Sequence, residues 1–208
     1  MKQAKESSFR FLCAAAKILP EFAAFAAAVA AIFFDVIVLR QRCSESCLVE
    51  WCQFAAILSS GLILLAAAVR DRENDAGLML AAILFLDMAI REQDAALDCI
   101  FHGFWTIPVG ILTVFALFYA YFRHDAAISG LEKIAACDNF AELAIGLLII
   151  LFFSRMIGYK MLWRAFGAGD TIQFCKRFVE ESLELLGYLL ILVWSLRFFF
   201  VSSKPRCD

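Results

Sequence analysis

The chain has 208 residues, of which 63% are hydrophobic and only 19% are charged, and its mean hydropathy is +0.78. A soluble globular domain carries about 25% charged residues and fewer apolar ones, so this composition excludes that class. The formal net charge is −2 and no basic face is evident, which excludes nucleic acid as an expected partner. The lipid bilayer is therefore the surrounding that we expect.

Long stretches without a charged residue predict membrane-crossing segments. A hydrocarbon core about 30 Å thick needs roughly 20 helical residues to cross it. No stretch alternates apolar and polar residues with the period of a strand. The sequence therefore predicts an all-α, polytopic membrane bundle that forms one transmembrane helical domain over residues 1–208. Its six predicted helices cover residues about 19–39, 48–69, 76–97, 102–122, 140–163 and 177–200, and residues 123–139 form a loop with room for a short surface helix.

The distribution of Lys and Arg predicts the orientation, because these residues concentrate in cytoplasmic loops. If the N-terminus is cytoplasmic, that side holds eleven Lys and Arg residues and the opposite side holds six. Both termini are therefore predicted to be cytoplasmic. Odd-numbered helices then leave the membrane at the outer side, and even-numbered helices enter it there.

The last predicted helix carries a polar stripe on an otherwise apolar surface. Glu180, Glu184 and Tyr188 are spaced i, i+4 and i+8, so a helix presents them on one face. Glu181 lies beside this stripe, and Arg177 lies at its outer end. In a membrane protein such a stripe is expected to face something other than lipid.

The third predicted helix carries a second polar stripe. Asp87, Arg91, Asp94 and Asp98 follow one another at i, i+4, i+7 and i+11, and Glu92 lies about one position off their face. Further polar residues come from three other helices in the outer half: Asp35, Glu50, Gln53 and Arg155. Five predicted helices thus deliver ionisable side chains to a similar depth.

The depth of these charges makes their convergence necessary. At a rise of about 1.5 Å per residue, Arg155 lies roughly 12 Å and Glu184 roughly 10 Å below the outer end of the bundle. A charge at a helix centre costs on the order of 2.5–3.5 kcal/mol on insertion scales. The side chains must therefore pair with one another, line a water-filled cavity or bind a ligand. The predicted polar cavity consists of Glu50, Gln53, Asp87, Arg91, Glu92, Asp94, Arg155, Glu180, Glu181, Glu184 and Tyr188.

The balance of charges favours a cavity over a closed network of salt bridges. The acids outnumber the two deep arginines, even with Lys176 and Arg177 at the rim. Surplus carboxylates take up protons or hold a cation. We expect Arg155 to organise Glu184 and Glu50, and Arg91 to organise Glu181 and Asp94. The predicted activity is binding or movement of a small cation, of protons or of a polar headgroup. The non-catalytic alternative is a membrane scaffold or accessory subunit whose ion pairs are purely structural.

A metal-dependent intramembrane hydrolase is the enzymatic alternative. Its ligands and base would be Glu180, Glu181, Asp94 and His102. The sequence names no catalytic residue beyond this set and no cofactor. Of the eight cysteines, Cys43 and Cys47 lie close together on the outer side, where an oxidising compartment permits a disulfide. They form no zinc pattern, so a disulfide and two free thiols both stay open.

Four short motifs resemble those of a group of small six-helix bacterial inner-membrane proteins of unknown function. The motifs are Glu50-Trp51-x-Gln53, Arg91-Glu92-x-Asp94, Ser154-Arg155-x-x-Gly158 and Glu180-Glu181-x-x-Glu184-Leu-x-Gly187-Tyr188. The resemblance implies a multi-pass protein of the bacterial inner (cytoplasmic) membrane and no activity. Glu180-Glu181 is also similar to the first motif of the CAAX-type intramembrane proteases, in which an arginine follows four residues after the glutamate pair. Leu185 stands at that place here, and no Phe-x-x-x-His motif follows.

Overall fold

The computed structural model describes residues 2–38, 47–167 and 169–202, with side chains described from Ile18 to Phe200 within these ranges. Every element in this part of the chain is a helix. In chain order they are α1 (Lys2–Phe33), the π-helix η1 (Phe34–Val38), α2 (Leu48–Arg70), α3 (Asp75–Glu92), α4 (Asp94–Leu97), α5 (Thr106–Phe122), α6 (His124–Ala135), α7 (Phe140–Leu148), the π-helix η2 (Ile149–Phe153), α8 (Ser154–Ile157), α9 (Lys160–Arg164) and α10 (Asp170–Ser202).

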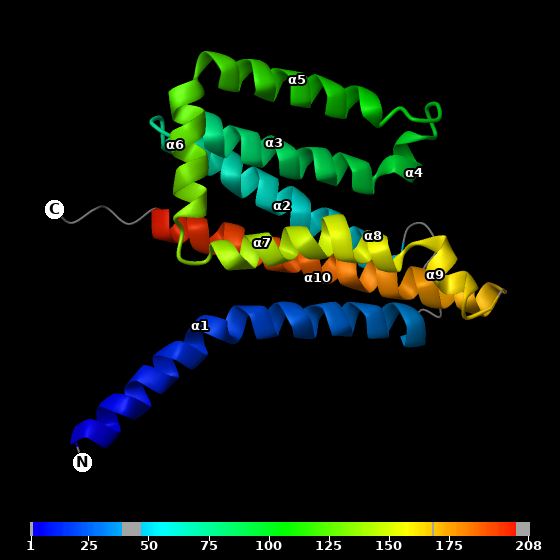
Figure 1. Cartoon of the computed structure of the whole chain (residues 1–208), viewed down its shortest axis with the longest axis horizontal. Coiled ribbons are helices and arrows are strands. Elements are labelled where there is room, and N and C mark those ends of the chain that lie inside the picture. The colour runs from blue at the N-terminus through cyan, green and yellow to red at the C-terminus, as the bar shows by residue number, and fades with distance from the viewer. Residues whose placement is uncertain (1, 39–46, 168, 203–208) are drawn as a thin grey trace.

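The long helices run along one common direction, and α6 crosses one end of them (Figure 1). We call this end the α6 end and the opposite end, where α9 and α4 lie, the α9 end. Helix α10 finishes at the α6 end, and α1 starts from the same end (Figure 1). The short surface helix that was predicted within residues 123–139 is confirmed as α6.

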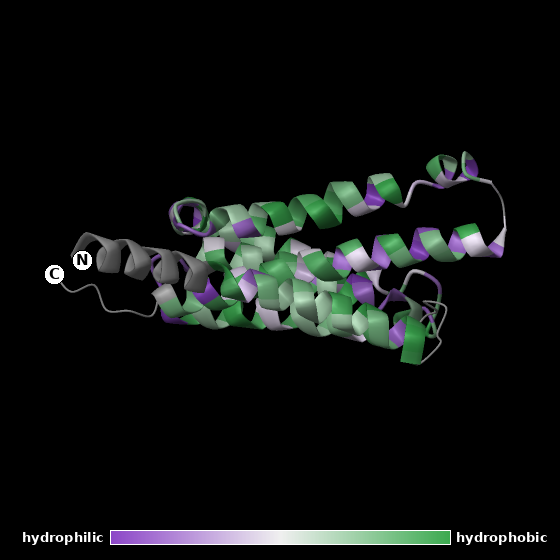
Figure 2. Cartoon of the chain, turned by 90° about the horizontal axis from the view of Figure 1, so that it is seen from below, coloured by the Kyte–Doolittle hydropathy of each residue, from purple (hydrophilic) through white to green (hydrophobic). Residues whose placement is uncertain are grey.

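Four helical segments of the described chain are long and apolar enough to cross a membrane. They are Ile18–Val38, Leu48–Arg70, Phe140–Ile157 and Asp170–Phe200, and α5 with α6 would add a fifth if this pair, bent by 106°, is one span. Hydrophobic residues dominate these long helices (Figure 2). The prediction of an all-helical protein with apolar, membrane-compatible helices is thereby confirmed in this coarser form.

The third predicted helix differs from the observed one. Helix α3 ends at Glu92, and the chain starts again as the short α4 at Asp94, because Gln93 ends the hydrogen-bonded ladder. With Asp75, Asp87, Arg91 and Glu92 in 18 residues, α3 carries too many charges to count among the candidate spans. It nevertheless lies inside the bundle and packs more extensively against α2 than any other pair of helices does among the described elements.

Small residues allow α2 and α3 to approach closely. The buried surface between them is rich in alanine and glycine: Ala56, Gly61, Ala67 and Ala68 of α2, and Ala82 and Ala89 of α3. A Cβ added at Gly61 would meet the Leu86 side chain at 2.9 Å. Close backbone approach through small residues is the typical mode of helix association in membranes, where lipid is as apolar as a leucine side chain.

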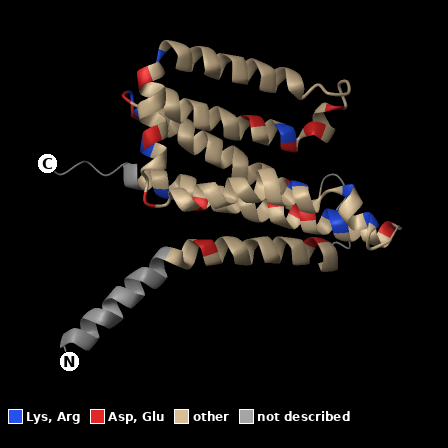
Figure 3. Cartoon of the chain, in the orientation of Figure 1, with Lys and Arg blue, Asp and Glu red and all other residues tan. Residues whose placement is uncertain are grey.

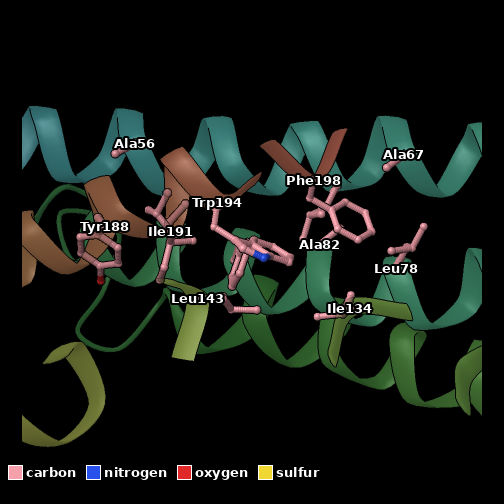
Figure 4. Close-up of a cluster of buried hydrophobic side chains, with 14 of the residues drawn as sticks. Ala56, Ala67, Leu78, Ala82, Ile134, Leu143, Tyr188, Ile191, Trp194 and Phe198 are labelled. Carbon is pink, nitrogen blue, oxygen red and sulfur yellow. The ribbon is translucent and has the colours of Figure 1, made fainter. Parts of the chain in front are cut away.

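Helix α10 lies at the centre of the bundle and packs against α2, α7 and α1. Its Tyr188, Ile191, Trp194 and Phe198 are at most 3% exposed and form the middle of the apolar core (Figure 4). At the crossing with α7 and η2, an added Cβ at Gly187 would meet the Ile150 side chain of η2 at 2.5 Å. Between its two ends, therefore, α10 is surrounded by closely packed apolar side chains.

Helix α5 lies at the edge of the bundle and contacts α3 and α6. Among its residues only Ala116 is buried, whereas Ile111 and Phe118 are 65% and 64% exposed. The Tyr119 hydroxyl donates a hydrogen bond to Asp75 of α3 at 2.7 Å. An exposed apolar helix held by a few polar contacts at its end is what a lipid-facing helix requires.

Ion pairs close the α6 end. Arg197 of α10 donates to Glu21 of α1 at 3.0 Å and also to Glu142 of α7. Lys133 of α6 pairs with Asp71, which follows α2. Burial by itself would raise the pKa of Asp71, but hydrogen bonds from Lys133 and Asn74 outweigh this and hold the pKa below its usual range. These contacts join α1, α7 and α10 in one cluster and join α6 to the turn after α2 in another.

Candidate functional site: a mixed-charge cavity at the α9 end

Charged residues gather mainly at the two ends of the long helices (Figure 3). At the α9 end they surround a cavity of about 330 Å³ between α2, α3, α4, α8 and α10. Six carboxylates and four cationic side chains line it: Glu50, Glu92, Asp94, Glu180, Glu181 and Glu184, with Arg91, Arg155, Lys176 and Arg177. We call it the mixed-charge cavity.

Two glutamates of α10 form one wall of the cavity, and Arg155 of α8 holds both. A guanidinium nitrogen of Arg155 lies 3.0 Å from Glu184, and the other lies 3.6 Å from Glu180. Glu180 is also paired with Lys176 one turn earlier, at 2.9 Å. The Ser154 hydroxyl completes the binding of Glu184 by donating a hydrogen bond at 3.0 Å. Each of these two carboxylates therefore has at least two partners.

The π-helix η2 lies directly before Ser154 and Arg155. A π-turn adds one residue to a helical turn, so it changes which side chains face the neighbouring helix and leaves the backbone ladder irregular. The Ser154 hydroxyl also contacts the carbonyl oxygen of Ile150 inside η2, at 3.0 Å. Gly158, four residues after Ser154, leaves room for the Glu180 carboxylate, since an added Cβ would lie 2.4 Å from its Oε1.

The opposite wall comes from α3 and is linked to α10 by a tyrosine. Arg91 donates to Glu92 Oε1 at 2.9 Å, and the Tyr188 hydroxyl donates to the same oxygen at 2.7 Å. Gln53 of α2, which is fully buried, donates to the backbone and side-chain oxygens of Glu181 at 2.9 and 3.0 Å. Tyr188 and Gln53 thus fix the floor of the cavity without lining it.

The structure brings together ten of the eleven residues that were predicted for the cavity. Eight line it, and Gln53 and Tyr188 support it. Asp87 is the exception: its carboxylate accepts a hydrogen bond from Thr113 of α5 at 2.8 Å, because it points to the α5 side of α3. The predicted pair of Arg155 with Glu184 is present, whereas Arg91 pairs with Glu92 and not with Glu181 or Asp94. Arg91 and Glu92 are neighbours in the sequence, so the guanidinium reaches this carboxylate on its own helix.

Asp35 was counted with the surplus acids, but the structure gives it a different role. Its carboxylate is fully buried and accepts hydrogen bonds from the backbone N–H groups of Leu48 and Val49, at 3.1 and 2.8 Å. These donors belong to the first turn of α2 and have no partner inside that helix. A negative charge there is stabilised by the helix dipole as well. Asp35 therefore caps α2 and is not one of the acids that line the cavity.

Three of the proposed metal ligands, Asp94, Glu180 and Glu181, line the mixed-charge cavity, but His102 does not. His102 contacts Asp98 at 2.9 Å, and its side chain is fully exposed. Within the described ranges no group of three or more His, Cys, Asp or Glu side chains is placed to hold a metal ion. The reason is the break after α3, which turns Asp98 and His102 into a separate loop contact. Cys47 is a buried free thiol, and Cys43 lies outside the described residues.

Sequence reasoning missed two features of the polar architecture. Ser154 was part of a predicted motif, but no contact was predicted for it. A hydroxyl next to an arginine in an apolar helix indicates a second donor to the carboxylate that the arginine binds. No partner was predicted for Arg197, whereas it binds Glu21 and Glu142. Two lone acids near the inner ends of separate helices were the available signal for that triad.

The fold and the site define an all-helical protein with four or five membrane-compatible helices and a cavity of mixed charge at one end of the bundle. Comparisons with protein-family models, with curated proteins and with solved structures give no match to this chain. The resemblance to small six-helix inner-membrane proteins and to CAAX-type proteases therefore stays a prediction.

Proposed function

We propose that the protein is a multi-pass protein of the bacterial inner membrane with six spans, both termini in the cytoplasm and the α9 end at the outer surface. Helix α3 would be the span that composition alone does not identify. Its charges are compatible with this because they have partners: Asp75 pairs with Arg123 at 3.0 Å, Asp87 accepts from Thr113, and Arg91 pairs with Glu92. Paired charges facing the bundle are the form in which membranes tolerate ionisable residues.

We further propose that the mixed-charge cavity binds a small organic cation such as the amine of a polar headgroup. The observation that carries this proposal is the composition of the wall, six carboxylates against four cations around an open volume of about 330 Å³. A water molecule takes up about 30 Å³, so the cavity is large for a bare ion and lies at the small end of ligand pockets. A purely structural network would have no need of such a void.

The tightly packed middle of the bundle favours a binding site at the cavity over a transport path through the protein. Below the cavity, Tyr188, Ile191 and Trp194 of α10 are fully buried, and they pack against residues of α2, α3 and α7 (Figure 4). A substrate would have to displace these side chains to reach the α6 end. The cavity therefore acts as a site that is open toward the α9 end, and the bundle below it acts as its support.

The test is titration of the purified full chain in detergent micelles with ethanolamine, followed by calorimetry. Ethylene glycol serves as the neutral control, because it has the same size and no charge. We expect saturable binding of ethanolamine only, and the double variant Glu181→Gln/Glu184→Gln should bind about tenfold to a hundredfold more weakly, as loss of charge-assisted hydrogen bonds implies. Glu132→Gln, on the exposed side of α6, should bind like the parent. Equal binding in the double variant and the parent would refute the proposal.

A further inference from the structure

Two more hollows adjoin the mixed-charge cavity. The first, of about 460 Å³, lies between α9 and the start of α10, and we call it the basic pocket. Four cationic side chains line it, Lys160, Arg164, Lys176 and Arg177, and its lining contains no carboxylate. Lys176 and Arg177 belong to the mixed-charge cavity as well, so the two hollows are neighbours. A site for an anion thus lies directly beside a site for a cation.

Two cations of the basic pocket, Lys160 and Arg164, are available for a ligand. Lys176 is paired with Glu180, but Lys160 and Arg164 form no ion pair with any residue of the described ranges. Both are exposed and stand on α9 beside Trp163, whose indole Nε1 donates to the backbone of Ile157. Tryptophan and basic side chains at the end of a membrane helix lie at the level of lipid headgroups. Phosphate is the abundant anion at that level.

The second hollow is apolar and lies on the outside of η2 and α8. Leu151, Phe152, Met156 and Tyr159 line it together with Arg155, and these four apolar or aromatic side chains are 52% to 70% exposed. Arg155 also lines the mixed-charge cavity, so it connects this apolar groove to the polar site. From Tyr159 to Leu151 the groove extends about 12 Å along the helix axis toward the middle of the bundle. This is the direction that an acyl chain takes from a headgroup.

From these three adjoining hollows we infer that the ligand is a phospholipid with an amine in its headgroup, of the phosphoethanolamine class. The phosphate lies in the basic pocket against Lys160 and Arg164, the ammonium group enters the mixed-charge cavity, and an acyl chain follows the apolar groove. The inference rests on the proposed amine site and extends it to the whole lipid.

The spacing along α10 fits such a headgroup. Lys176 and Arg177 stand four residues before Glu180 and Glu181, which corresponds to about 6 Å along the helix. A two-carbon linker between phosphate and amine spans a distance of this order. Arg155 supports the same arrangement, because a guanidinium has five N–H donors and its contacts with Glu180 and Glu184 leave others to face the groove. Its side chain is 46% exposed.

The test compares four compounds on the full chain in micelles by calorimetry. They are free ethanolamine, free phosphoethanolamine, dihexanoyl phosphatidylethanolamine and dihexanoyl phosphatidylglycerol. We expect the phosphatidylethanolamine to bind most tightly, about tenfold or more above phosphoethanolamine because the chains add buried apolar area. The phosphatidylglycerol, which lacks the amine, should bind about tenfold more weakly than the phosphatidylethanolamine.

Two variants separate this inference from the amine site itself. Lys160→Gln/Arg164→Gln should weaken phosphatidylethanolamine about tenfold and leave free ethanolamine unchanged, since only the phosphate contact is lost. Arg72→Gln, an exposed arginine at the α6 end, is the matched control and should change neither. If ethanolamine binds but the double variant binds phosphatidylethanolamine like the parent, the phosphate assignment is wrong while the amine site stands.

The source of the ligand is decided by the same titrations. Equal affinity for phosphoethanolamine and for the short-chain lipid would show a soluble phosphate ester as the ligand and would overturn the lipid assignment. Tighter binding of the phosphatidylglycerol would show a general anionic-lipid site and would overturn the amine assignment. Phe152→Ser/Met156→Ser should lower the affinity for the lipid toward that for phosphoethanolamine, and an unchanged affinity would rule out the groove.

Discussion

The two ends of α10 arrange their charged residues in different ways. At the α6 end, Arg197 binds two carboxylates from two other helices, Glu21 and Glu142, in direct contact. At the α9 end, Glu180, Glu181 and Glu184 share their cations with three further acids around an open cavity. The same helix therefore ends in a compact ion triad on one side and in an incompletely filled polar wall on the other.

This difference teaches that charge number alone does not separate structure from function. Both ends have more acids than bases, two against one in the triad and six against four in the cavity. In the triad, one guanidinium reaches both acids, so packing can close around it. In the cavity, the acids come from four helices, α2, α3, α4 and α10, and are spread over a volume that no single arginine spans.

Loss of Arg197 should be the most damaging change in either region. Arg197→Gln leaves Glu21 and Glu142 close together without their cation, and removing one partner of a largely buried ion pair costs about 3–5 kcal/mol. The measurement is the free energy of unfolding in mixed micelles. Arg72→Gln, an exposed arginine at the same end, is the control and should stay within about 0.5 kcal/mol of the parent. Equal effects of the two variants would contradict a structural triad.

Loss of a cavity carboxylate should cost less stability and more binding. Glu184→Gln removes the ion pair with Arg155, but Ser154 can still donate to the remaining side-chain oxygen and Arg155 keeps Glu180. We expect the free energy of unfolding to fall by about 1–2 kcal/mol, less than for Arg197→Gln, and ethanolamine binding to weaken. A loss of stability as large as that of Arg197→Gln would remove the distinction between the two ends.

Filling the space at Gly158 should change binding with little effect on the fold. In Gly158→Ala the new Cβ would meet the Glu180 carboxylate, which stands at the end of a flexible side chain and can shift. We expect a cost of at most about 1 kcal/mol in unfolding and a clear drop in ethanolamine affinity, because Glu180 leaves Arg155. Gly110→Ala on α5, where an added Cβ meets nothing within 4 Å, is the control. Unchanged binding in Gly158→Ala would mean that Glu180 is not part of the site.

The smallest effect is expected at the surface pair of Asp71 and Lys133. The contacts from Lys133 and Asn74 hold the folded-state pKa of Asp71 below its usual value of about 3.9. The stabilisation is therefore complete above about pH 4, is lost as the pH falls through the lower folded value, and amounts to at most about 1 kcal/mol for a partly exposed pair. Thermal unfolding of the parent and of Asp71→Asn should differ at pH 7 and converge in acid. A difference that grows in acid would show the opposite sign of the pKa shift.

Most residues of the cavity could be predicted because their positions follow from helical spacing within single helices and from the cost of an unpaired charge. Helical spacing put Glu180, Glu184 and Tyr188 on one face, and the cost of a lone charge in hydrocarbon required partners for Arg155. Asp87 and Asp98 could not be placed in this way. The helix breaks at Gln93, so Asp98 no longer shares the helical face of Arg91. The partner of Asp87 is Thr113, and the position of α5 decides this contact.

Composition and periodicity predict a bundle of apolar helices with charged residues toward their ends, because they distinguish apolar helix faces from polar stripes. Which charged residues pair with one another depends on the tertiary structure. It made Asp35 a cap for α2, joined Arg197 to Glu21 and Glu142, and left a void beside Arg155. The physical reason is that ion pairs between helices depend on rotation and register about each helix axis, and close contacts such as that of Gly146 with Gly187 set these, not the hydrophobic pattern.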